Sequence, residues 1–297
     1  MRLRSPTPAF WIVLACLWFL VTTLAHLEFS LWLVRERTSL GGSFSYKDYV
    51  PVVATITGAT LLAWLAYDLH KARWRSPVIL YWLIWGVCVL LVDVYLTYTP
   101  NEYAHYPQYA LLAWLIAKGI DPDRTRLAIF KLMFWTTLAG MVDELAQYLW
   151  ITVSYSDYLD FNDFLVNQLA SIAGALLYYG FSPQQVRLSP VRTELRVMLA
   201  LALVIALGFG SGRIAITADT PVPPGGVALT PSGESRLYLQ RRPDAYGFSA
   251  PAPHRGRYWV LDPATGMLLI VLVGGLFSSL PSALRKLPSC CSSSREG

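Results

Sequence analysis

Residues 127–153 read LAIFKLMFWTTLAGMVDELAQYLWITV. This run is largely apolar, contains no proline and is longer than the about 20 residues that a helix needs to cross a bilayer core of roughly 30 Å. Asp143 and Glu144 nevertheless stand side by side near its end. Ionisable side chains inside a membrane span are energetically costly, so each one suggests a function. The run therefore predicts a membrane helix that carries a polar site.

The composition of the whole chain agrees with a membrane protein. Of 297 residues, 55% are hydrophobic and only 14% are charged, against the roughly 25% charged that is usual for soluble domains. The net charge of +5 is explained by basic cytoplasmic loops, so we expect no nucleic acid partner. The expected fold is an all-α integral membrane protein that is embedded in the lipid bilayer.

Charged residues and prolines divide the chain into eight apolar stretches, which we expect to be about eight transmembrane helices. These stretches are residues 10–34, 50–67, 77–98, 106–117, 127–153, 164–181, 197–210 and 267–284. The fourth and seventh are short for a full span. Lys and Arg gather in alternate connections, and segments 98–106 and 154–162 contain none. This asymmetry predicts a multi-pass protein of the cell inner (plasma) membrane with both termini in the cytoplasm.

Residues 211–265 form the longest hydrophilic stretch, which is rich in proline and glycine. Its β-compatible runs at 236–240 and 257–261 suggest a small β-hairpin cap over the bundle, although a mobile loop is the alternative; we favour partial order. The expected topology makes this loop extracytoplasmic. We divide the chain into an N-terminal three-helix membrane region (1–99), a helical core (100–181) and a C-terminal two-helix region with the outer loop (182–297).

Polar residues from three segments are expected to converge at the outer end of the bundle. Asp143 and Gln147 are four residues apart and so share one helix face, as do Asp163 and Asn167 on the next helix. Glu102 and His105 are three residues apart and would share a face if the fourth helix begins there. The full candidate site is Glu102, His105, Asp143, Glu144, Gln147, Asp160, Asp163 and Asn167.

Small residues extend one of these faces. Ala170 and Gly174 follow Asn167 in a small-xxx-small pattern, which lets another helix approach closely. His26, Glu28 and Asp93 lie near the outer ends of other spans; we expect structural roles for them, although any of them could complete the site.

Structural explanations compete with a functional site. Asp160, Asn162 or Asp163 can be the N-cap of the following helix. Gln147 and Asn167 can form interhelical hydrogen bonds worth about 0.6–2 kcal/mol. The pair Asp143 and Glu144 is harder to explain in this way, because two adjacent buried carboxylates need cations, protons or donors nearby.

Motifs that would identify a cofactor or a common reaction are missing from the sequence. The chain has no CxxC pair and its four His are scattered, so the sequence predicts no metal site and no cofactor. A P-loop, a GxSxG, an HExxH and a dinucleotide fingerprint are also missing. Whether the protein is an enzyme is left open.

The order of the polar residues resembles a known family. Glu102-x-x-His105, then Asp143-Glu144-x-x-Gln147, then Asp163-x-x-x-Asn167 with a following Gly174 are similar to the pattern of the VanZ-like family, membrane proteins related to a teicoplanin-resistance protein. The likeness covers about residues 100–181, which we accordingly treat as a VanZ-like core. The family usually carries an Arg between the Gln and the Asp, and residues 150–160 contain none; Arg255 or Arg257 could replace it.

The resemblance implies a cell-envelope protein linked to antibiotic resistance. Its polar site would engage a lipid-linked cell-wall component or a glycopeptide, with Asp143 and Glu144 as acid/base or cation-holding groups and His105 as their partner. Gln147 and Asn167 would orient the ligand through hydrogen bonds. The alternative is a non-catalytic accessory or scaffold subunit that binds another membrane protein. A transporter ranks third, because the sequence shows no internal repeat.

Overall fold

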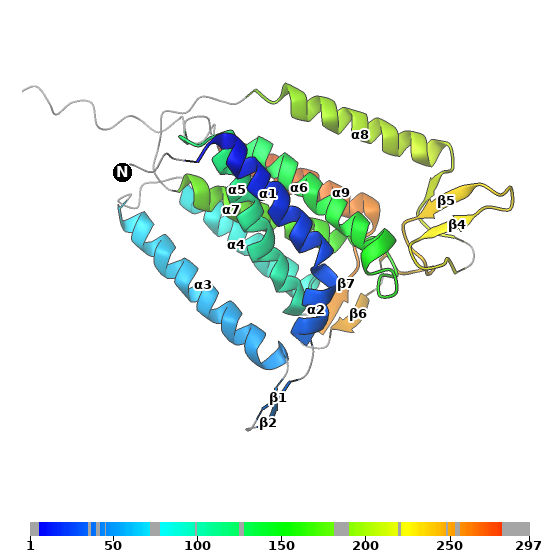
Figure 1. Ribbon diagram of the computed structural model, residues 1–297, viewed down its shortest axis with the longest axis horizontal. Coiled ribbons are helices and arrows are strands. Elements are labelled where there is room, and N and C mark those ends of the chain that lie inside the picture. The colour runs from blue at the N-terminus through cyan, green and yellow to red at the C-terminus, as the bar shows by residue number, and fades with distance from the viewer. Residues whose placement is uncertain are drawn as a thin grey trace, which may run out of the picture.

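The computed structural model describes residues 6–34, 37–39, 42–44, 46–71, 78–98, 100–124, 128–180, 190–218, 221–247, 249–252 and 256–280. The protein is mostly helical: a helical bundle carries a small β-rich region at one end (Figure 1). The helices are α1 Pro8–Leu24, α2 His26–Val34, α3 Tyr46–Lys71, α4 Val78–Tyr95, α5 His105–Ile120, α6 Ile129–Ala146, α7 Phe161–Tyr179, α8 Arg192–Gly210 and α9 Pro263–Ser278. A 3₁₀ turn, Pro100–Ala104, precedes α5, and a π turn, Gln147–Ile151, follows α6.

Each of the eight predicted apolar stretches contains a helix, and the helix of the first is broken. Helices α1 and α2 meet at a bend of 57° next to Ala25. The seventh stretch was expected to be short, but α8 begins earlier and has 19 residues. The fourth, α5, has 16 residues, which gives a length of about 24 Å.

Length and composition support fewer spans than the eight predicted. Three helical segments of the described chain are long and apolar enough to cross a membrane, Val50–His70, Val78–Tyr95 and Arg192–Gly210, and the bent pair α1–α2 raises the number to four. Helix α9 is apolar but shorter. The membrane character of the chain is thus supported, whereas the eight crossings and the position of the termini stay predictions.

Helix α7 forms the centre of the bundle. All its residues except Asp163 and Leu177 are buried, and α4, α5, α6 and α9 pack around it. Small side chains permit this packing. A Cβ atom on Gly174 would lie 2.2 Å from the backbone oxygen of Ala110, so α5 crosses α7 with its backbone almost in contact. The predicted close approach along the Ala170–Gly174 face is confirmed.

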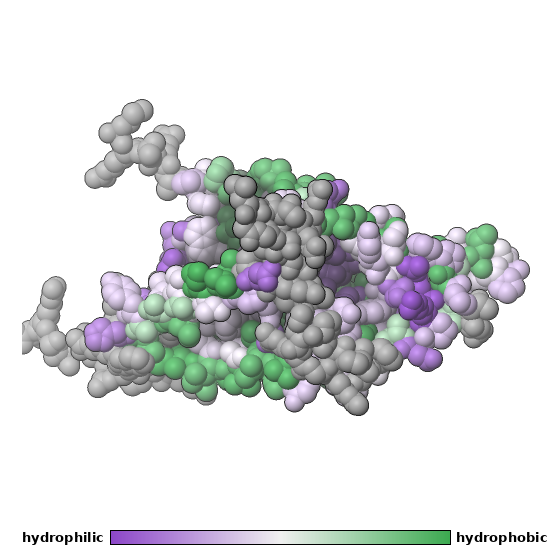
Figure 2. Space-filling view, turned by 90° about the horizontal axis from the view of Figure 1, so that it is seen from below, coloured by the Kyte–Doolittle hydropathy of each residue, from purple (hydrophilic) through white to green (hydrophobic). Residues whose placement is uncertain are grey.

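Helices α3 and α8 lie at the edges of the bundle (Figure 1). Only 6% of the residues in the apolar window of each helix are buried by the rest of the protein. Figure 2 shows hydrophobic patches on the surface in a view from below. Water does not favour such large exposed apolar faces, whereas lipid tails accept them.

The long hydrophilic segment is partly ordered, as predicted. It contains a three-stranded sheet of order β3-β5-β4 and a separate antiparallel hairpin β6-β7. The strands are β3 Ile214–Ala215, β4 Val227–Leu229, β5 Ser235–Tyr238, β6 Ser249–Ala252 and β7 Gly256–Trp259. A further hairpin, β1 Arg37–Ser39 with β2 Gly42–Phe44, joins α2 to α3.

The β-rich region, which comprises strands β3 to β7 between α8 and α9, is attached to the bundle through the connection between α6 and α7. The backbone N–H of Leu159 donates to Leu239 O over 2.8 Å, and the N–H of Arg241 donates to Asp157 O over 2.7 Å. Tyr158 also forms a β-bridge with Gln240. The region therefore covers the end of the bundle at which α6 stops and α7 begins.

Candidate functional site

Asn167 lies at the centre of a hydrogen-bond chain that joins three helices. Its Oδ1 lies 2.8 Å from His105 Nδ1 on α5, and its Nδ2 donates to Glu144 Oε1 on α6 over 3.2 Å. Gln147 Nε2 donates to the same Glu144 oxygen over 3.4 Å. All four side chains are buried. The predicted convergence of the three segments is therefore present in the structure.

Asp143 lies next to Glu144 in the chain and interacts with Tyr109. Its Oδ2 accepts a hydrogen bond of 2.6 Å from the hydroxyl of Tyr109, whose ring lies parallel to the His105 ring. Asp143 is completely buried, and its Oδ1 has no hydrogen-bond partner among the described residues. Gln147, which shares a helix face with Asp143, donates its hydrogen bond to Glu144.

Close packing positions these side chains. A Cβ atom on Gly140 would lie 2.9 Å from Asn167 Cβ, so α6 approaches α7 directly beside the hydrogen-bond chain. About two turns later the helix changes to the π turn at Gln147. Such π turns occur often at functional sites, and this one leads into the pocket described next.

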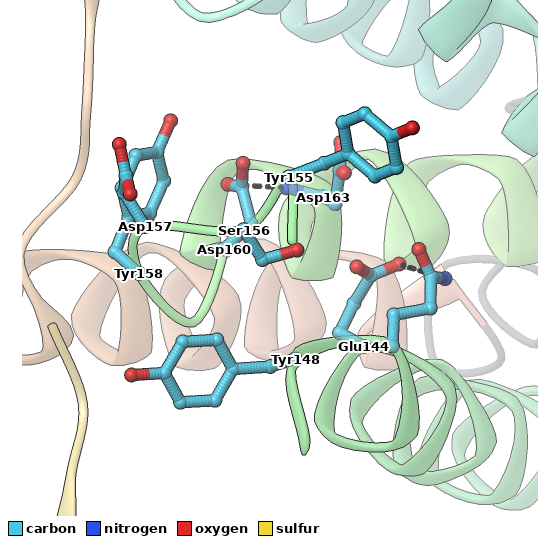
Figure 3. A pocket seen from close by; sticks show the side chains of 9 residues that line it. Glu144, Tyr148, Tyr155, Ser156, Asp157, Tyr158, Asp160 and Asp163 are labelled. Carbon is cyan, nitrogen blue, oxygen red and sulfur yellow. Dashed lines mark hydrogen bonds between the residues drawn. The ribbon is translucent and has the colours of Figure 1, made fainter. Parts of the chain in front are cut away.

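A polar pocket of about 190 Å³ opens beside the cluster. It is lined by Glu144, Gln147, Tyr148, Tyr155, Ser156, Asp157, Tyr158, Asp160 and Asp163. Figure 3 shows Glu144 pointing toward Ser156 and Asp163. The walls of the pocket combine carboxyl groups, hydroxyls, an amide and aromatic rings. Such a combination can hold a polar ligand and fix its orientation.

Asp160 has two roles in this arrangement. Its Oδ1 accepts hydrogen bonds from the backbone N–H groups of Asn162 and Asp163, which makes it the N-cap of α7. Burial, and then the neighbouring Asp163 carboxylate, raise the pKa of Asp160 to about 8. The expected N-cap is thus present, and the same carboxyl group lines the pocket.

Asn162 fastens the β-rich region beside the pocket. Its Nδ2 donates to Leu96 O over 3.0 Å and to Trp259 O over 2.7 Å, while its Oδ1 accepts from the backbone N–H of Leu261 over 3.0 Å. One buried side chain therefore connects α4, β7 and the start of α9 to the first turn of α7. Its role is structural.

The loop arginines contact the pocket segment from outside. Arg255 and the side chain of Arg257, suggested as substitutes for the missing family Arg, fall outside the described parts. Arg241 instead donates from one guanidinium nitrogen to Val153 O and Ser156 O over 2.7 and 2.9 Å. Arg242 lies 3.4 Å from an Asp157 oxygen. These arginines hold the pocket wall.

Some predicted site residues lie elsewhere. Glu102 was expected to share a face with His105, but it is in the 3₁₀ turn and accepts hydrogen bonds from the backbone N–H of Tyr98. Asp93 accepts a hydrogen bond from Tyr103. His26, in contrast, reaches the cluster, with its ring 5.7 Å from that of His105.

Several residues of the site were not predicted from the sequence. Tyr148, Tyr155 and Tyr158 line the pocket, and none of them was among the candidate residues. The spacing of Tyr109 from His105, four residues on one helix, was the available signal for its place in the cluster.

One group of side chains has the spacing of metal ligands. The ligand atoms of His105, Glu144 and Asp163 all lie within 4.8 Å of one another. No metal site was predicted from the sequence, because the three residues come from different helices and match no metal-binding motif. The arrangement can accept hydrogen bonds, hold protons or coordinate a cation.

Comparisons of the chain with protein-family models, curated proteins and solved structures give no match.

Proposed function

We propose that this chain is a VanZ-like membrane protein whose pocket binds the hydrophilic part of an envelope ligand, either a lipid-linked cell-wall component or a glycopeptide. The main observation that supports this proposal is the polar pocket of about 190 Å³ beside the buried hydrogen-bond chain around Asn167. The order of Glu102, His105, Asp143, Glu144, Gln147, Asp163 and Asn167 in the sequence supports the family assignment.

The chemistry of the lining favours one part of such a ligand. Glu144, Asp157, Asp160 and Asp163 bring carboxyl groups to the pocket, and carboxylates accept hydrogen bonds from hydroxyl and amino groups. They repel phosphate, and the Arg241 and Arg242 side chains are engaged with the pocket wall. The bound part is therefore a saccharide or an amino-bearing group, and the phosphate of a lipid-linked ligand lies outside the pocket.

The proposed membrane arrangement follows the distribution of basic residues. The bundle crosses the inner (plasma) membrane eight times with both termini in the cytoplasm, and the pocket opens outward under the β-rich region. The exposed apolar surfaces of α3 and α8 support contact with lipid. The shorter helices α5 and α9 lie beside α7 or α1, where protein contacts help to satisfy their surfaces.

Replacement of Glu144 by Gln tests the binding function. The protein in lipid nanodiscs is titrated with teicoplanin and with a lipid-linked disaccharide. Glu144 offers a carboxyl acceptor in the pocket, and a buried hydrogen-bonding group left without its partner costs about 1–3 kcal/mol. The expected loss of affinity in Glu144→Gln is therefore about 10- to 100-fold.

Glu234→Gln is the matched control. It makes the same chemical change at an exposed residue that pairs with Arg213 in the β-rich region, away from the pocket. This variant should bind both probes like the wild type. Equal affinities of the wild type and Glu144→Gln for the probe that binds would contradict the proposal, as would no binding of either probe by the wild type.

The hydrogen-bond chain around Asn167 supports one alternative function, that of a non-catalytic scaffold subunit. Its hydrogen bonds join α5, α6 and α7 and can serve only to lock these helices together. In that case Glu144→Gln lowers the melting temperature, the wild type binds neither probe, and the protein co-purifies with a larger membrane complex.

A further inference from the structure

We propose that His105, Glu144 and Asp163 form a binding site for one divalent transition-metal ion, Zn²⁺ or Mn²⁺, at the inner wall of the pocket. The proposal rests on the proposed function in one respect, because the ion would share the pocket with the ligand. Its evidence is independent and comes from the geometry of the three side chains.

The three ligands are held close together on different helices. The ligand atoms of His105, Glu144 and Asp163 lie within 4.8 Å of one another, and His105 Nε2 lies 3.9 Å from Asp163 Oδ2. Zinc bonds of about 2.0–2.1 Å in a tetrahedral arrangement separate neighbouring ligand atoms by about 3.3 Å. Small side-chain rotations therefore suffice to close the group around an ion.

Asn167 sets the protonation of the His105 ring. Its NH₂ group donates to Glu144, so its carbonyl oxygen faces His105 Nδ1 and accepts a hydrogen from it. The other nitrogen, Nε2, then carries a lone pair and faces the Asp163 carboxylate. Metal-binding histidines usually donate their second N–H to an oxygen in this way, which fixes both the tautomer and the ring orientation.

Several atoms at this place have no protein partner. His105 is only 4% exposed, and its Nε2 makes no hydrogen bond within the described residues. Asp163 Oδ1 and Asp143 Oδ1 are inaccessible to solvent and also have no hydrogen-bond partner there. Buried polar atoms are nearly always satisfied, and an ion is one explanation for exceptions.

The charge of the site also favours a cation. Asp143, Glu144, Asp160 and Asp163 gather here, and among the described residues the ion pairs of Lys and Arg go to other acids. The ion pairs of the cluster itself involve only His105. A divalent ion would compensate the carboxylates without a basic side chain.

The ligand set selects the class of ion. Imidazole suits zinc and other transition metals, whereas Mg²⁺ and Ca²⁺ prefer oxygen ligands alone. Three protein ligands leave further coordination positions free, as in zinc sites that bind water or substrate. These positions would face the pocket, where a ligand hydroxyl or amino group can reach the ion.

Metal titration of the purified full-length protein tests the site. The protein is stripped with a chelator in detergent and titrated with Zn²⁺ or Mn²⁺ alone, and bound metal is counted by mass spectrometry. The wild type should bind one ion per chain. His105→Gln and Asp163→Asn should each weaken binding at least tenfold, and Asn167→Ala should weaken it about 10- to 100-fold.

Asp262→Asn is the matched control. It removes one carboxylate outside the pocket lining, at the N-cap of α9, while keeping a residue that caps helices well, and it should leave the stoichiometry unchanged and the affinity within about threefold. Wild-type protein that binds no metal, or ligand variants that bind as tightly as the wild type, would overturn the proposal.

A second measurement does not depend on the folding of variants. Pulsed electron paramagnetic resonance of Mn²⁺ bound to the wild type should show coupling to one imidazole nitrogen, and bound Mn²⁺ without that coupling would overturn the proposal. Metal binding together with a failure to bind either envelope probe would support the cation site and contradict only the proposed function. Probe binding by metal-free protein that takes up no metal would overturn the cation site alone.

Discussion

Replacement of Gly174 by Ala should both destabilise the bundle and disturb the candidate site. The new Cβ atom would lie 2.2 Å from the backbone oxygen of Ala110 and 2.9 Å from two further Ala110 backbone atoms. Backbone atoms cannot rotate away as a side chain can. Helices α5 and α7 must therefore move apart at this crossing.

The size of the movement follows from the contact distance. Real Cβ contacts are essentially never shorter than 3.0 Å, so the backbones must separate by roughly 0.8 Å. If His105 moves with α5 by that amount, its Nδ1 moves from 2.8 Å to about 3.6 Å from Asn167 Oδ1, which is too long for a hydrogen bond. A change at the centre of the bundle would thus reach the site.

The energetic effect combines two opposing terms. Overpacking in a core costs about 1–3 kcal/mol, while the better helix propensity of Ala returns roughly 0.5–1 kcal/mol. The net expectation is destabilisation by about 1–2 kcal/mol, which corresponds to a melting temperature lower by roughly 2–8 °C for a chain of this size.

Thermal unfolding in detergent measures this effect, with Gly86→Ala as the control. Gly86 lies in α4, and a Cβ atom there meets nothing within 4 Å, so its substitution should be neutral or slightly stabilising. A melting temperature of Gly174→Ala equal to or above that of Gly86→Ala would refute the reasoning about the α5–α7 crossing.

Two further predictions concern pH and topology. The folded pKa of Asp160 is raised to about 8 from 3.8, so the folded state binds more protons in this window and stability is lost as pH rises from about 4 to about 8. Melting temperatures of chelator-treated protein should fall over this range, and a slope as steep in Asp160→Asn as in the wild type would contradict this cause. For topology, a membrane-impermeant maleimide should label Ser232→Cys in intact cells and Asp123→Cys only after lysis, in a background without the native cysteines. The reverse pattern would reject the expected orientation.

The membrane character and the positions of the helices could be predicted because they depend on local composition. Each apolar stretch had to satisfy its backbone hydrogen bonds internally, which only a helix can do within one segment. The break at Ala25 could not be predicted in this way, since no proline marks it. The early start of α8 was also missed, because Arg192 and Glu194 interrupt the apolar pattern although Glu194 is buried near Lys131.

The candidate site was predicted in part for a related reason. Helical spacing alone placed Asp163 and Asn167 on one face, and the cost of burying Asp143 and Glu144 identified them as exceptional. The same spacing was misleading for Glu102, because residues 100–104 form a 3₁₀ turn and not the first turn of α5.

The sequence by itself determined that the chain is a helical membrane protein with a polar cluster near the ends of several helices. Hydrophobicity and helical periodicity are properties of neighbouring residues, so no tertiary information was needed for these conclusions. The tertiary structure alone decided that His105, Glu144 and Asp163 meet, that Asn167 fixes the His105 ring, and that the β-rich region borders the pocket. Those contacts depend on how closely α5, α6 and α7 approach one another, which the small residues Gly140 and Gly174 permit but do not specify.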